Sequence, residues 1–136
     1  MEYELRGCNC LVTIFKNTHN IEHLDVSENN IRNFWAIYFK RIIYTQNENR
    51  NKILWMYNLR NEKPPSTDYK KGLISLAFDN ANIEDNFFNT IIESLEFDNY
   101  MKSISFRNNL LSEKNILKTI KILKKNKNIT YFDLEF

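Results

Sequence analysis

Residues 21–31 read IEHLDVSENNI, and this stretch decides the fold that we predict for the chain. Apolar side chains fill its first, fourth, sixth and last positions, and Asn29 fills the ninth, which fits the pattern L-x-x-L-x-L-x-x-N-x-L. Leu24 and Val26 alternate with polar residues, as in a short strand with one buried face. An Asn after such a strand suits a turn, because its amide can bond backbone groups that packing removes from water.

The same pattern recurs along the chain. In the C-terminal half the spacing is regular, because Leu76, Ile104 and Phe132 follow one another at intervals of 28 residues. The N-terminal half is irregular, and Ala81 replaces the turn Asn in one of the better matches. Aligned on the middle apolar residue, six strands are predicted, centred on Tyr3, Leu24, Tyr57, Leu76, Ile104 and Phe132.

Helices between the strands are predicted by a second pattern with the same 28-residue shift. Apolar residues at spacing i, i+4, i+7 form one stripe on a helix. Ser112 precedes the second of these helices and is predicted to cap it. The two stripes are Phe88, Ile92 and Leu95, and Ile116, Ile120 and Leu123.

The N-terminal half is predicted with less regularity. Residues 32–44 form a helix, and the polar run 45–51 forms a loop. Residues 61–72 contain two prolines and a closing glycine, so an extended link is expected there. We therefore predict a single domain over 1–136, with irregular repeats in 1–72 and regular repeats in 73–136.

On residues 73–83, 101–111 and the two helix stripes, the chain resembles the leucine-rich repeat superfamily. Its C-terminal half is similar to the ribonuclease-inhibitor-like subclass, whose repeats carry a full α-helix. The resemblance implies an α/β solenoid with a curved parallel β-sheet inside and helices outside, of five to six repeats without evident caps. It also implies recognition of a protein partner of unknown identity, and it transfers no catalytic position.

Composition sets further bounds on the function. Nineteen basic and seventeen acidic residues give a formal charge of +2, which does not favour nucleic acid or an anionic membrane as partner. No apolar run approaches the roughly 20 residues of a membrane span. Cys8 and Cys10 are too close in sequence for a useful structural disulfide, so an intracellular, cytoplasmic setting is expected.

The predicted binding surface is the concave face of the sheet, where side chains between the buried strand positions point outward. Solenoids commonly bind partners on this surface, although a solvated face without a partner stays open as an alternative. The candidate partner-binding residues are Arg6, Asp25, Asn58, Arg60, Asp79, Ser105, Arg107 and Asp133.

No enzyme chemistry, cofactor or metal is predicted. The two glycines, Gly7 and Gly72, exclude a glycine-rich phosphate loop. Cys8 and Cys10 lack a second pair of Cys or His ligands at zinc spacing. Non-enzymatic protein binding or scaffolding is therefore the predicted function.

Two alternatives remain. One is a regulator of an enzyme, such as a small-GTPase activator that supplies Arg60 in trans. The other is a nucleic-acid or membrane-surface binder that uses the lysines of residues 114–127, although a solvated helix face explains the same pattern. The last repeat, with Phe132 and Leu134, would leave an apolar edge strand open, so self-association is also expected.

Overall fold

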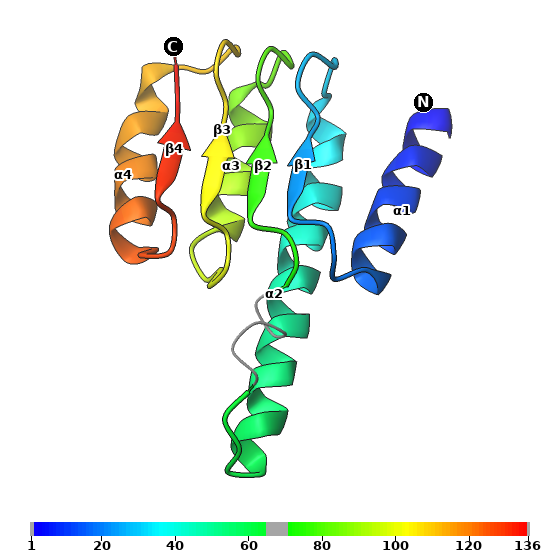
Figure 1. Cartoon of the computed structure of the whole chain (residues 1–136). Helices are drawn as coiled ribbons and strands as arrows, with labels where there is room; N and C mark the ends of the chain where they lie inside the picture. The colour runs from blue at the N-terminus through cyan, green and yellow to red at the C-terminus, as the bar shows by residue number, and fades with distance from the viewer. Residues whose placement is uncertain (1, 65–70, 136) are drawn as a thin grey trace.

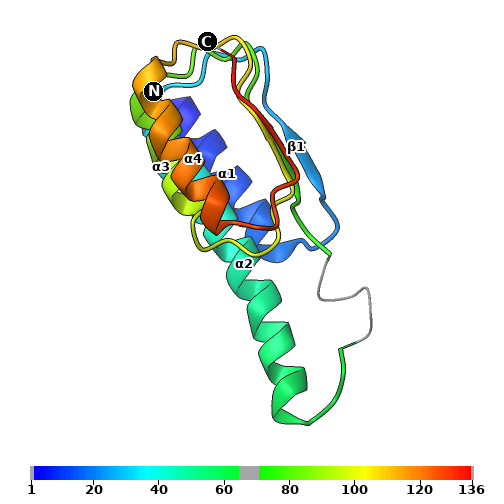
Figure 2. The same ribbon diagram turned by 90° about the vertical axis from the view of Figure 1, so that its left-hand side faces the viewer.

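The computed structural model describes residues 2–64 and 71–135, which form two layers (Figures 1 and 2). One layer is a parallel sheet, and the other consists of helices that all cover the same face of that sheet. The strands of the described part are β1 (His23–Asp25), β2 (Ser75–Ala77), β3 (Ser103–Ser105) and β4 (Tyr131–Asp133). Its α-helices are α1 (Glu2–Asn17), α2 (Ala36–Leu59), α3 (Asp85–Ser94) and α4 (Ile116–Lys125). Short 3-10 turns at Asn33–Trp35 and Glu113–Asn115 lead into α2 and α4.

The strands pair in the order β1-β2-β3-β4, and every pair is parallel. The central residue of each strand lies beside that of the next, so Leu24, Leu76, Ile104 and Phe132 form one row across the sheet. Four of the six predicted strand positions and their relative register are therefore confirmed. This row points toward the helices because side chains alternate along a strand.

The Asn turns also behave as predicted. The side-chain amide of Asn29 donates to the Val26 and Ser27 carbonyls at 3.0 and 3.1 Å. Asn109 reaches the neighbouring unit, where its Oδ1 accepts from the backbone N–H groups of Ala81 and Ile83, both at 3.0 Å. Asn109 thus bonds backbone groups of its own turn and of the turn that contains Ala81. The turn after β2 can therefore have Ala81 at the position where the pattern expects an Asn.

A second turn position requires a left-handed backbone. Glu28, Asn80 and Asn108 hold equivalent places after β1, β2 and β3, with φ of 61°, 51° and 54°. Asn tolerates this conformation because its short polar side chain can bond locally, whereas Glu has no such compensation. Glu28 therefore carries backbone strain that the two Asn residues largely avoid.

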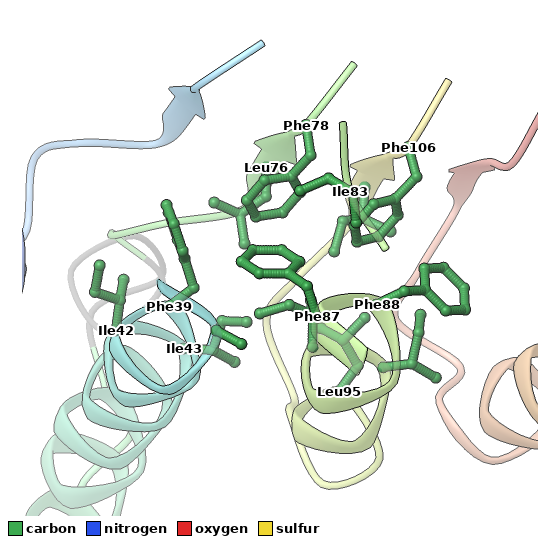
Figure 3. Packing of buried hydrophobic residues seen from close by; sticks show 14 of the residues in the cluster. Phe39, Ile42, Ile43, Leu76, Phe78, Ile83, Phe87, Phe88, Leu95 and Phe106 are labelled. Carbon is green, nitrogen blue, oxygen red and sulfur yellow. The ribbon is translucent and has the colours of Figure 1, made fainter. Parts of the chain in front are cut away.

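The core lies between the layers and is rich in phenylalanine (Figure 3). Phe78 from the sheet side stacks on Phe106 with ring centroids 5.1 Å apart. Phe78 also meets Phe39 of α2 and Phe87 of α3 edge-on, at 5.1 and 5.3 Å. Edge-to-face and offset-stacked rings at such distances add roughly 0.5–1.5 kcal/mol per pair beyond area burial.

The strand predicted around Tyr3 is wrong, because residues 2–17 form α1. Cys8 and Phe15 are buried, and Leu11 and Val12 between them pack against the core cluster. This spacing is a helical stripe, and it outweighs the short alternation that suggested a strand. α1 packs beside α2 and covers the N-terminal end of the helix layer, where no cap had been predicted.

The loop predicted at 45–51 and the strand predicted around Tyr57 are also wrong, because α2 runs unbroken from Ala36 to Leu59. Its buried face begins with apolar residues and continues with polar ones, Gln46, Asn47 and Arg50. The polar composition of this run suggested a loop. The structure instead buries these side chains and satisfies them with backbone groups of other segments.

Gln46 connects three segments of the chain. Its Nε2 donates to the carbonyls of Phe15 and Thr18 at 2.6 and 3.2 Å, and its Oε1 accepts from Leu73 N at 2.9 Å. Arg50 donates to the Leu73 and Lys71 carbonyls at 2.8 and 3.2 Å. These bonds fix the approach to β2, although it follows an irregular link.

The predicted extended link over 61–72 lies partly outside the described residues, because residues 65–70 are not described. Its closing glycine is required by the packing. Gly72 has a φ of 140°, and a Cβ there would approach Arg50 Nη2 to 2.2 Å. Any larger residue would displace the Arg50 guanidinium.

The C-terminal turns of α2 extend past the end of the sheet, as both views show (Figures 1 and 2). Trp55, Met56 and Leu59 are exposed on this overhang. None of the helices in the described part is long and apolar enough to cross a membrane.

Candidate protein-binding face

One face of the sheet is covered by no helix of residues 2–64 and 71–135, and we call it the outer sheet face. It is formed by the strand residues on either side of the central row, and the two inner strands carry only small side chains, serine or alanine, at these positions. The edge strands carry larger side chains, with Asp25 on β1 and Tyr131 and Asp133 on β4. The outward strand residues are His23, Asp25, Ser75, Ala77, Ser103, Ser105, Tyr131 and Asp133.

Asp79 joins the ends of three adjacent strands. Its backbone N–H donates to Ser27 Oγ at 2.9 Å. Its Oδ1 accepts from the Ser105 hydroxyl at 2.5 Å and from the Arg107 N–H at 2.8 Å. The Asp79 carboxylate therefore links neighbouring strand ends through internal hydrogen bonds. Ser105, which was predicted to face the solvent, is buried, with 8% of its surface exposed.

Arg107 connects this cluster to β4. Its Nε lies 3.4 Å from Asp133 Oδ2 and 3.7 Å from Glu135 Oε2. The Tyr131 hydroxyl donates to Asp133 Oδ2 at 2.9 Å. This hydrogen bond raises the pKa of Tyr131, because the phenolate form would face the Asp133 carboxylate.

Asp25 stands at the opposite edge of the face and is exposed. Its Oδ1 accepts from the Ser27 N–H at 2.9 Å. Hydrogen bonds from the Ser27 side chain and backbone lower the pKa of Asp25, so this carboxylate stays ionised in mild acid. The outer sheet face therefore combines the carboxylates of Asp25, Asp79 and Asp133 with one guanidinium, and its balance is acidic.

Three of the predicted binding residues lie elsewhere. Arg6 is on α1, where it pairs with Glu2 at 3.1 Å. Asn58 is in the last turn of α2, and Arg60 follows the end of that helix. All three were placed on the face through the two strand predictions that the structure overturns. The face brings together Asp25, Asp79, Ser105, Arg107 and Asp133.

The lysines of residues 114–127 are partly used within the protein. Lys118 bonds Glu93 at 2.5 Å, Lys114 lies 3.7 Å from Asp85, and Lys125 pairs with Glu96. All three acidic partners belong to α3 or its neighbouring turn. These pairs hold adjacent helices together, which reduces the positive charge available to an external phosphate.

Burial raises the pKa of the Cys8 thiol to about 11, with a further contribution from Glu4. This thiol is therefore protonated at neutral pH. In residues 2–64 and 71–135, no three His, Cys, Asp or Glu side chains are grouped so that they could hold a metal ion.

Sequence reasoning missed the roles of Gln46 and Arg50 in the core and of Asp79 as a junction. Asp79 and Arg107 are 28 residues apart, so the repeat spacing could have signalled that they hold equivalent positions just after two adjacent strands. Gln46 and Arg50 are four residues apart on one helix face, and this spacing is visible once the run is taken as helical.

A parallel sheet backed by helices, with Asn turns in a regular register, defines an α/β fold of the leucine-rich-repeat-like class. No protein-family model matches the sequence, and no curated protein sequence matches it. Solved structures do match its fold. The tropomodulin C-terminal domain from Caenorhabditis elegans aligns with a TM-score of 0.61 at 10% identity, over 92% of this chain and 62% of that one.

Leiomodin-1 actin-binding site 2 aligns with a TM-score of 0.63 at 16% identity, over 91% of this chain and 60% of that chain. The chain thus spans about three fifths of the length of each neighbour. These matches overturn the resemblance to ribonuclease-inhibitor-like repeats, because the architecture that they share with this chain is that of the tropomodulin and leiomodin domains. The 28-residue spacing alone could not distinguish the two.

Proposed function

We propose that the chain is a non-enzymatic protein-binding module and that its outer sheet face contacts the partner. The observation that carries the proposal is the outer sheet face itself, on which charged groups are held at set positions by a hydrogen-bonded parallel ladder. Side chains fixed in this way lose little conformational entropy when they bind. The free thiols of Cys8 and Cys10 suit a reducing, intracellular setting.

The charge of the face indicates the kind of partner. Asp25 and Asp133 stand at opposite edges, and the small serine and alanine side chains lie between them. A complementary surface would be broad, would lack deep projections and would place basic side chains near the two edges. Actin is the first partner to test, because the leiomodin-1 domain with this fold is described as an actin-binding site.

The test measures co-sedimentation with filamentous actin and fluorescence titration with monomeric actin. Asp25→Lys and Asp133→Lys should each weaken binding by about tenfold or more, because each places a like charge against the basic partner. Lys40→Glu is the matched control, since it reverses one exposed charge on the helix side. It should leave binding unchanged.

If neither form of actin binds, the choice of actin is wrong, and affinity capture from the source cell followed by cross-linking then tests the module itself. Cross-links from a captured partner to residues near Asp25 or Asp133 would support the outer sheet face. Cross-links confined to the helix side, or equal loss of binding in Lys40→Glu, would contradict it.

A further inference from the structure

The outer side of α4 is built like a helix–helix contact but has no helix against it in the described part. The stripe formed by Phe88 and Ile92 of α3 and by Leu95, which follows the end of that helix, is at most 1% exposed. The residues that hold the equivalent positions on α4 are more accessible, with Ile116 at 38%, Ile120 at 42% and Leu123 half-buried. The repeat thus places an apolar stripe where the next element would pack.

The sheet is open on the same side. The backbone N–H of Tyr131 donates to the Lys102 carbonyl at 3.0 Å, and the backbone N–H of Phe106 donates to the Asp133 carbonyl at 2.9 Å. In a parallel ladder alternate residues bond to opposite sides, so the backbone groups of Phe132 face away from β3. Phe132 is half-buried, whereas Ile104 in the same row is fully buried.

The charges along α4 indicate what can cover this edge. Glu113 precedes the helix, and Lys124 lies near its C-terminal end. Both are exposed, and neither makes an ion pair within residues 2–64 and 71–135. The apolar stripe of Ile116, Ile120 and Leu123 thus has a negative charge, Glu113, at its N-terminal end and a positive charge, Lys124, at its C-terminal end. Ile120 lies near the middle of the stripe.

We propose that this edge binds a second copy of the same chain, related by a two-fold axis near Ile120 and Phe132. Two α4 helices would then pack antiparallel through their apolar stripes. Glu113 of each copy would lie opposite Lys124 of the other, so the charge match occurs twice. The same axis places the two β4 strands antiparallel, which pairs the open backbone groups of Phe132 and extends the sheet across both copies.

The opposite edge of the molecule does not offer an equivalent surface for open-ended stacking. α1 lies beyond β1 in the helix layer, and no strand of the described part accompanies it (Figure 1). A copy that stacked its β4 on β1 in the register of the sheet would bring its own α4 against α1 in the helix layer (Figure 1). A closed pair therefore fits the two edges better than a growing chain.

The test is sedimentation velocity on the 136-residue chain over a range of concentrations up to about 1 mM. The expected result is a reversible equilibrium between monomer and dimer without larger species. Glu113→Lys and Lys124→Glu should each raise the dimer dissociation constant by about three- to tenfold, because two symmetry-related pairs become repulsive. The double variant, which exchanges the two charges, should restore an affinity near that of the original chain.

Ile120→Lys should abolish the dimer, and circular dichroism checks that the variant is folded. Leu59→Ser is the matched control, because it removes an exposed apolar side chain from the α2 overhang and should leave the dimer intact. A strictly monomeric chain, open-ended growth, failure of the charge exchange to restore binding, or loss of the dimer in Leu59→Ser would each overturn the proposal.

Discussion

Replacing Arg50 by methionine should cost about 3 kcal/mol of unfolding free energy, within a range of about 2–5. Arg50 is 2% exposed, donates to two backbone carbonyls and lies 4.8 Å from the Tyr100 ring centroid. A hydrogen bond to a charged group contributes about 1.5–3 kcal/mol, and a cation–π contact about 0.5–2. Methionine carries no charge, so the substitution also removes the free-energy cost of burying the guanidinium, and this gain offsets part of the lost hydrogen-bond and cation–π energy. The same burial lowers the pKa of Arg50.

The measurement is urea unfolding followed by circular dichroism at neutral pH, with the denaturant slope checked for constancy. Arg41→Met is the matched control, because Arg41 is exposed on the same helix and contacts only the Tyr38 ring among the interactions described, at 5.6 Å. It should cost about 0.5 kcal/mol or less. Equal, small losses in both variants would refute the role assigned to Arg50 in joining α2 to the start of β2.

Two further predictions concern the turns, and a third concerns Asp85 at the start of α3. Glu28→Asn should raise stability by about 0.5–1 kcal/mol, because Asn accepts the positive φ of 61° better than Glu; thermal or urea unfolding that shows a loss would contradict the strain argument. Asn109→Ala should cost about 2–4 kcal/mol, since it strands two backbone N–H groups of the neighbouring turn, and a cost below that of Asn29→Ala would contradict this. Bonds from Ser112 hold the pKa of Asp85 below its usual value of 3.8, so Asp85 contributes stability above that pH and loses it as pH falls through the folded value. Urea unfolding between about pH 5 and pH 2 should therefore show a weaker acid dependence for Asp85→Asn than for the original chain.

The sheet could be predicted from sequence because its determinants are local and repeated. Leu24 and Val26 alternate with polar residues, and Asn29 and Asn109 mark the turns, so each unit carries its own signature. The parallel row from Leu24 to Phe132 then follows from aligning these units. The same alignment puts Asp79 and Arg107 at equivalent positions after β2 and β3, and the binding role predicted for them and for Asp25 stays a prediction.

The helix predicted over residues 32–44 is confirmed as the start of α2. α1 and the C-terminal part of α2 could not be predicted from the strand pattern, because an apolar–polar–apolar triplet also occurs within helices. The triplet around Tyr57 lies in α2, and the buried polar residues just before it disguised the helix as a loop. Gln46 and Arg50 are buried only because backbone groups distant in sequence meet them, which no local pattern reveals. Ser112 shows a similar limit: it stands at the predicted cap position, but its hydroxyl donates to Asp85 at 2.7 Å and makes no cap hydrogen bond.

The long α2 also affects how the chain can change in length and in which order it folds. Equivalent residues of β1 and β2 are separated by 52 positions, whereas β2, β3 and β4 follow at 28, yet the register across the sheet is the same. Closing the longer connection costs only about 0.5 kcal/mol more than closing the shorter one, because the closure entropy grows with the logarithm of loop length. Helical turns could therefore be gained or lost in the exposed overhang of α2 with little thermodynamic penalty, whereas the turns up to Arg50 are fixed by burial. Residues 73–135, whose contacts are the most local, are expected to assemble before β1 joins the sheet.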